Sequence, residues 1–88
     1  MKRSSLPPLD DPRALEAAIK ASPEATANVL SYLDLLGVGH SGQISGATLG
    51  AICVEGDHAG RTWRRWIGGE RAFPAAAGRL LRLVAFGA

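Results

Sequence analysis

The 88-residue sequence predicts an all-α fold, a small bundle of about five short helices. Apolar residues recur at helical spacing in five segments, capping residues and prolines separate these segments, and the alternation typical of strands is missing. A chain of this length has room for one core. We therefore expect a flexible N-terminal arm over residues 1–10 and a single helical domain over residues 11–88.

The first predicted helix spans residues 12–21. Asp11 before Pro12 is typical of an N-cap followed by a first-turn proline. Apolar residues then recur at helical spacing until Ser22. They are Leu15, Ala18 and Ile19.

The second predicted helix spans residues 23–36. Ser22 and Pro23 repeat the same start signal, and Gly37 is a typical C-terminal cap. Between them lies an apolar stripe that we expect to face the core. The stripe consists of Val29, Leu30, Leu33 and Leu36.

Three further helices follow. The glycine-rich stretch GVGHSGQIS is a predicted loop that leads to Ser45, an N-cap for a helix over 46–54. After a second loop, the segment 61–68 is predicted to be helical and to end at a pair of glycines. Pro74 begins the last helix. Its inward-facing residues are Ala77, Leu80, Leu81 and Val84.

The predicted fourth helix separates its tryptophans from its arginines. At about 100° per residue, Trp63 and Trp66 lie on one side, and Arg61, Arg64 and Arg65 lie on the other. One face can therefore be anchored in a core by two indoles while the opposite face presents guanidinium groups. A helix of this length needs such anchoring because it is not stable alone.

Charge is distributed unevenly along the chain. Residues 1–60 carry four basic and seven acidic side chains, whereas residues 61–88 carry six arginines and one glutamate. This asymmetry indicates an anionic partner, and the planar guanidinium suits phosphate oxygens and guanine edges. An arginine-rich surface that is merely solvated is the alternative interpretation.

The stretch ISGATLGAIC, a turn and RTWRRWIGGERAFPAAAGRLLRLVA together resemble the phage-repressor-like (xenobiotic-response-element class) helix-turn-helix DNA-binding proteins. The resemblance covers residues 44–86. It implies a helix-turn-helix motif within the bundle, in which Leu49 and Ile52 are core residues of the first motif helix. It also implies that Gly50 is the small residue that lets the two motif helices approach.

The same resemblance implies the DNA-binding side chains. Arg61, Thr62, Arg64 and Arg65 would lie on the exposed side of the recognition helix, with Trp66 on its core side. Arg71 and His58 complete the candidate DNA-binding set. The connection VEGDHAG departs from the family, because it is about three residues longer than a tight turn, a length that a loop accepts at low cost.

A metal site or a catalytic site receives little support. Cys53, Asp57 and His58 lack a second pair of ligands at zinc spacing, and His40 is distant in sequence. A cysteine in the register of Cys53 is more typical of a core residue than of a nucleophile. We expect no metal, no cofactor and no enzymatic activity.

We expect a cytoplasmic protein without a membrane-spanning segment. The lone cysteine is compatible with a reducing compartment, and no stretch reaches roughly 18 consecutive apolar residues. The polar start of the chain does not resemble a secretory signal. Lys2 and Arg3 belong to the expected arm, which either reaches an adjacent minor groove or is disordered.

Two functions remain. The first is a sequence-specific regulator of transcription that binds double-stranded DNA, a small repressor or autoregulator acting by promoter occupancy, and a homodimer because one recognition helix covers few base pairs. The alternative is a protein-interaction module on a helix-turn-helix scaffold, such as a mobile-element inhibitor of a host defence complex. The acidic first half of the chain supports this alternative. Salt-dependent binding to duplex DNA discriminates between them.

Overall fold

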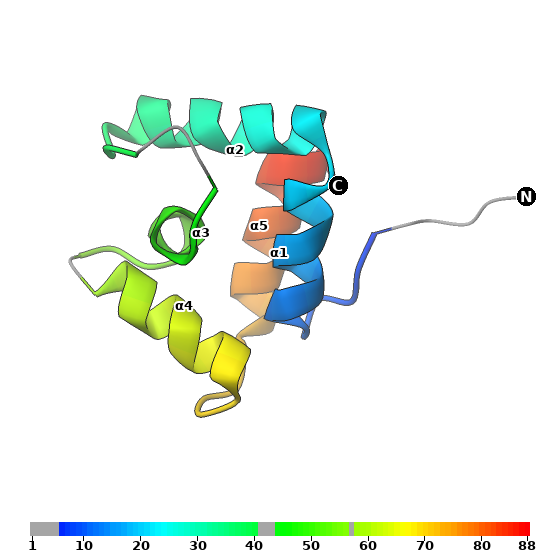
Figure 1. Ribbon diagram of the computed structural model, residues 1–88, viewed down its shortest axis with the longest axis vertical. Coiled ribbons are helices and arrows are strands. Elements are labelled where there is room, and N and C mark those ends of the chain that lie inside the picture. The colour runs from blue at the N-terminus through cyan, green and yellow to red at the C-terminus, as the bar shows by residue number, and fades with distance from the viewer. Residues whose placement is uncertain (1–5, 41–43, 57) are drawn as a thin grey trace, which may run out of the picture.

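The computed structural model describes residues 6–40, 44–56 and 58–88, and within these ranges it contains five α-helices and no strand (Figure 1). The predicted all-α class is confirmed. The predictions for Lys2, Arg3 and Asp57 fall outside the described residues. The helices are α1 (Pro12–Lys20), α2 (Pro23–Leu36), α3 (Gly46–Cys53), α4 (Ala59–Gly68) and α5 (Ala75–Phe86).

Side-chain caps start three of the helices as predicted. The Asp11 side chain accepts a hydrogen bond from the backbone N–H of Ala14 at 3.1 Å. At the starts of α2 and α3, the hydroxyls of Ser22 and Ser45 each accept one from the backbone N–H three residues later. Each bond satisfies one of the N–H groups that a helix start leaves without an intrahelical partner. At the other end, Gly37 and Gly69 cap α2 and α4 in the left-handed conformation, with φ of 75° and 83°.

The start of α4 differs from the prediction. The helix begins at Ala59, two residues before Arg61, and α3 ends at Cys53, one residue earlier than expected. The N-cap of α4 is His58, whose side chain makes no capping hydrogen bond, so the sequence carries no cap signal there. As a result, five residues separate α3 from α4. This connection is close to the usual 3–4 residues of a helix-turn-helix turn.

The helices enclose one core. In Figure 1, α2 crosses one end of the molecule, α1 and α5 lie side by side, and α3 and α4 form the remaining side. Asn28 of α2 donates from Nδ2 to the carbonyl of Ala85 at 2.9 Å and so ties α2 to the end of α5. The buried residues that form the core cluster are Leu15, Ile19, Ala25, Val29, Leu33, Leu49, Ile52, Trp63, Trp66, Ala77, Leu81 and Ala85.

The apolar stripe of α2 is only partly covered. Val29 and Leu33 are buried, but Leu36 is 49% exposed and its neighbour Leu35 is 84% exposed. About half of the Leu36 side chain is therefore exposed to solvent, and the prediction that it faces the core is wrong. Figure 1 gives the reason, since the last turn of α2 projects beyond α5.

Part of the predicted arm contacts the helical domain. Leu6 and Leu9 are half-buried. The carbonyl of Leu9 lies so close to Gly78 of α5 that a Cβ at this glycine would collide with it. Glycine is therefore needed where the N-terminal segment crosses α5.

No helix within the described residues has the length and apolar character needed to cross a bilayer. The longest, α2, has 14 residues, whereas a spanning helix needs about 20.

Candidate nucleic-acid interface

Helix α4 is anchored by a cluster of three aromatic rings. Trp63 is fully buried and Trp66 is 8% exposed. Their ring centroids lie 6.0 Å apart in an edge-to-face arrangement. Phe73, in the loop before α5, lies 5.9 Å from the Trp63 ring and 5.1 Å from the Trp66 ring. Such edge-to-face pairs stabilise beyond the area they bury, so α4 and the following loop are held as one unit.

Phe73 was not among the predicted functional or core residues. It directly precedes Pro74, the N-cap of α5, and one of its ring carbons lies 3.2 Å from the position that a Cβ on Gly78 would take. A hydrophobic staple pairs an apolar residue before the N-cap with an apolar residue at the fourth helical position. Here that position is Gly78, so the Phe73 ring packs over a helix surface that has no side chain. Because Gly78 stands where a staple needs an apolar side chain, this pattern does not identify Phe73 from the sequence.

Small residues bring α3 and α4 together. A Cβ on Gly50 would collide with the carbonyl of Ala59, and one on Gly60 would lie 3.2 Å from the Cβ of Ala47. The predicted role of Gly50 in the close approach of the two helices is thus confirmed. The predicted core positions Leu49 and Ile52 are also confirmed, with 0% and 6% exposure.

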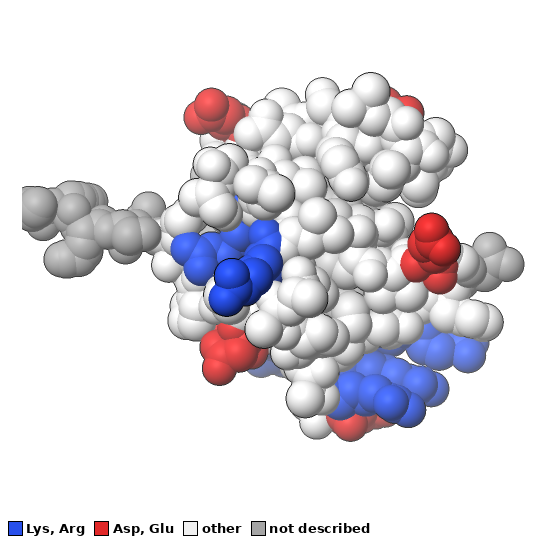
Figure 2. Space-filling view, turned by 180° about the vertical axis from the view of Figure 1, so that it is seen from behind, with Lys and Arg blue, Asp and Glu red and all other residues white. Residues whose placement is uncertain are grey.

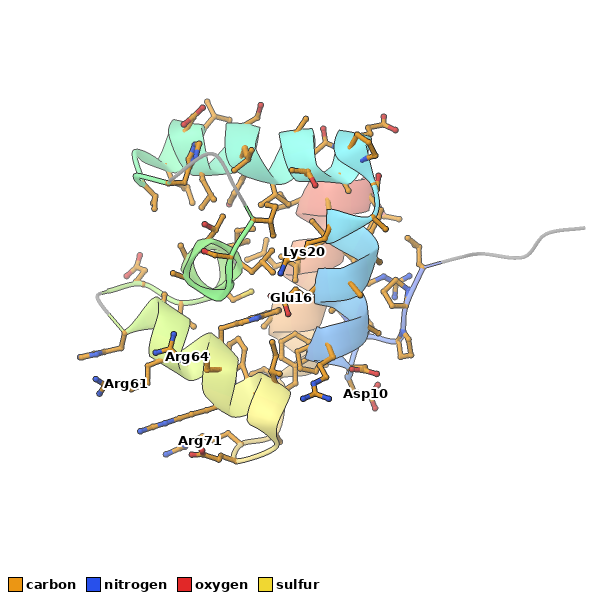
Figure 3. All side chains as sticks on the ribbon, viewed as in Figure 1. Asp10, Glu16, Lys20, Arg61, Arg64 and Arg71 are labelled. Carbon is orange, nitrogen blue, oxygen red and sulfur yellow. The ribbon has the colours of Figure 1, made fainter. Side chains whose placement is uncertain are left out.

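The opposite face of α4 carries the exposed arginines. Arg61, Arg64 and Arg65 are exposed, and so is Arg71 in the loop that follows. In Figure 3, the labelled Arg61 and Arg71 point away from the helical body, whereas Arg64 lies along α4, with its Nη1 3.6 Å from the position that a Cβ on Gly60 would take. Arg65 lies 4.0 Å from a carboxylate oxygen of Glu70, at the limit of an ion pair. The other three have no ion-pair partner within the described residues, so their charges are available to a ligand.

Two predicted DNA-binding residues are placed differently. Thr62 was expected on the exposed side of α4 but is half-buried. At about 100° per residue it lies roughly 40° from Trp66 around the helix, next to the aromatic cluster. His58 is exposed at the N-cap of α4. It therefore lies beside the arginine face without belonging to it.

The six C-terminal arginines do not form one surface. Figure 2 shows one basic group at the α4 end of the molecule and another over the side formed by α1 and α5, with uncharged surface between them. Arg79 and Arg82 belong to α5 and not to the α4 group. Hence the candidate interface consists of Arg61, Arg64, Arg65 and Arg71.

Cys53 is a structural residue of α3. Its Sγ donates to the carbonyl of Ala77 at 3.6 Å, which links α3 to α5. Burial raises the pKa of the Cys53 thiol to about 11, so the thiolate that a metal or a nucleophilic reaction requires is disfavoured. Within the described residues, no three His, Cys, Asp or Glu side chains gather as a metal site would require.

Compared with protein-family models, curated proteins and solved structures, the chain matches none of them.

Proposed function

We propose that the protein is a sequence-specific regulator of transcription that binds double-stranded DNA through α4. The observation that carries the proposal is that the two faces of α4 carry different side chains. Its tryptophans are locked into an aromatic cluster, while Arg61 and Arg64 on the other face are exposed and without an ion-pair partner among the described residues. A fixed helix with free guanidinium groups on its outer face suits the major groove.

The dimensions of α4 agree with this role. Ten residues at about 1.5 Å each give a helix of roughly 15 Å, and a major groove about 12 Å wide admits an α-helix. The helix lies at the outer edge of the molecule, with α3 packed behind it (Figure 1). It can therefore enter a groove without rearrangement of the core.

Different arginines suit different contacts. Arg61 and Arg64 lie in the first two turns of α4, the part of a recognition helix that contacts base edges. Arg65 and Arg71 lie toward the end of the helix and beyond it, and they suit phosphates at the groove edge. The pair between Arg65 and Glu70 does not prevent this, since exposed ion pairs contribute about 1 kcal/mol or less.

The start of α4 adds a contact for DNA. The side chain of the N-cap residue His58 makes no capping hydrogen bond. It therefore leaves the first backbone N–H groups of α4 available to a ligand. Helix N-termini of this kind bind phosphate oxygens. His58 itself is exposed and lies within the same turn.

One α4 helix reads few base pairs, and we propose that the protein binds DNA as a homodimer or a larger assembly. It would act as a small repressor or autoregulator by occupying a promoter. The resemblance to the phage-repressor-like helix-turn-helix proteins supports this proposal.

The decisive experiment is selection of duplexes from a random-sequence pool by the purified chain, followed by titration of the selected duplex and a scrambled duplex. We expect a preference of at least roughly a thousandfold for the selected sequence. We also expect the logarithm of the binding constant to fall with the logarithm of the salt concentration between about 50 and 200 mM. For a dimer that neutralises on the order of 4 to 8 phosphates, the slope is about −4 to −7. A flat slope, or equal competition by the scrambled duplex, would favour the protein-interaction alternative.

A further inference from the structure

An apolar groove lies where α2 and α3 end, beside the first residues of the connection to α4. Its volume is about 270 Å³. Leu36 in its wall is 49% exposed, and the adjacent Leu35 is 84% exposed, so large apolar surface faces solvent here. Its rim carries one carboxylate, that of Glu55. The lining residues are Leu36, Val38, Ala51, Val54, Glu55 and Gly56.

An exposed apolar side chain lies on α5. Leu83 is 56% exposed and is the remaining large apolar side chain that the described surface leaves open. Arg79 precedes it by one helical turn, on the same face, and is exposed. Figure 2 shows the basic group over this side of the molecule. Leu83 is thus an exposed apolar side chain with the positive charge of Arg79 beside it.

We propose that these two surfaces bind each other in different copies of the chain: Leu83 of one copy enters the groove of the next, and Arg79 pairs with Glu55. The proposal matches an exposed apolar side chain with an apolar groove, and a positive charge with a negative one. Complementary charges at the edge of an apolar contact select the partner and the register. The inserted leucine and the groove wall remove exposed apolar surface from water on both copies.

A symmetric contact between two grooves is less favourable. It would bring the acidic rims of both copies together, because each rim carries Glu55. It would also leave Leu83 exposed on each copy. The charges on the two surfaces therefore favour a head-to-tail contact.

The two surfaces lie on different sides of the molecule, so one copy can use both at once. The groove is lined by Leu36, the last residue of α2. In Figure 1 this end of α2 lies far from α1, whereas α5 lies beside α1. A heterologous contact of this kind closes into a ring or continues as a chain. The contact includes no residue of α4, so α4 remains free. Where the proposed DNA binding holds, copies linked in this way would bind tandem repeats of one orientation.

The association itself does not rest on DNA binding, and its test uses the full chain without DNA. Sedimentation velocity of the wild-type chain, up to about 1 mM because small contacts are weak, should show concentration-dependent association. Glu55→Arg and Arg79→Glu should each weaken it at least about tenfold, and Leu83→Gln should do the same. Glu24→Arg and Arg13→Glu are matched controls that make the same charge changes at exposed positions elsewhere, and they should associate as wild type does.

A mixture of the two charge variants tests whether the charges at positions 55 and 79 pair with each other. The Glu55→Arg chain retains Arg79 and Leu83, and the Arg79→Glu chain retains the groove with Glu55. Together they can form the wild-type contact and also a second contact in which both charges are reversed but still opposite, so we expect the mixture to associate as the wild type does, although each variant alone associates weakly. A wild-type chain that stays monomeric, unchanged association of either variant, or a mixture that stays monomeric would overturn the proposal.

Discussion

Gly50 in α3 lies against the carbonyl of Ala59, the first residue of α4, at a separation that no Cβ can occupy. The contact involves backbone on both sides. A longer side chain elsewhere could rotate away, but here one of the two helices must move. The position of α4, and with it the position of its arginines, depends on the absence of a single methyl group.

Gly50→Ala is therefore expected to destabilise the protein, although alanine favours helices more than glycine does. We expect the free energy of unfolding to fall by about 1 to 3 kcal/mol, the range for overpacked interiors. Urea denaturation followed by circular dichroism measures this change.

Gly68→Ala is the matched control for that variant. Gly68 also lies in a helix, and a Cβ there would meet nothing within 4 Å. Its stability should stay the same or rise by up to about 1 kcal/mol through helix propensity. Equal stability of Gly50→Ala and the wild type would show that a Cβ at position 50 fits between α3 and α4.

The aromatic cluster should be structural and not part of the DNA contact. Trp66→Ala removes a nearly buried indole that packs on Trp63 and Phe73. We expect it to lower the free energy of unfolding by about 3 to 5 kcal/mol. DNA affinity should be lost only in proportion to the unfolded fraction. A stable, folded Trp66→Ala protein without DNA affinity would place the indole on the DNA instead.

Arg64 should determine sequence preference. The side chain is exposed in the second turn of α4. Loss of a bidentate contact to a base should weaken binding of the selected duplex by about 1 to 3 kcal/mol and relax the preference at one position.

Lys20→Ala is the control for the loss of one positive charge, because Figure 3 shows Lys20 on α1 away from the labelled arginines. Circular dichroism should be unchanged in both variants. If Arg64→Ala bound every duplex as the wild type does while remaining folded, the assignment of α4 as the recognition helix would fail.

Local signals were sufficient to predict most of the fold. Each cap depends on residues three positions apart, so Asp11, Ser22 and Ser45 could be assigned from the sequence. The two faces of α4 likewise follow from helical spacing alone. The early start of α4 could not be predicted because His58 makes no capping hydrogen bond.

Properties that depend on how the helices pack against one another could not be predicted from the sequence. The exposure of Leu36 depends on where α2 projects past α5 (Figure 1). The division of the arginines into two groups depends on the placement of α5 relative to α4 (Figure 2). Charge counted along the chain indicated an anionic partner, but only the arrangement in space limits the candidate interface to α4 and the loop after it.

Cys53 should make stability depend on pH above neutrality. Burial raises the pKa of its thiol from 9.0 to about 11, so between these values the unfolded chain loses the thiol proton while the folded chain keeps it. The contribution of this group to stability is therefore constant below pH 9 and is lost as the pH rises to 11, by about 3 kcal/mol in all. Urea denaturation at several pH values, compared with Cys53→Ala, measures the effect, since other titrations cancel in the difference. Parallel pH profiles of the two proteins would contradict the prediction.

Arg71 should contribute to affinity without contributing to sequence preference. Its backbone N–H lies 3.4 Å from the carbonyl of Arg65, so the residue is held at the end of α4, with its exposed side chain beyond the helix. From there it suits a phosphate at the groove edge. Arg71→Ala should weaken the selected and the scrambled duplex by similar factors and make the log–log salt slope shallower by about 1 for each copy bound. Lys20→Ala should leave the slope unchanged. A loss confined to the selected duplex would assign Arg71 to base recognition, whereas unchanged affinity and slope would remove it from the interface.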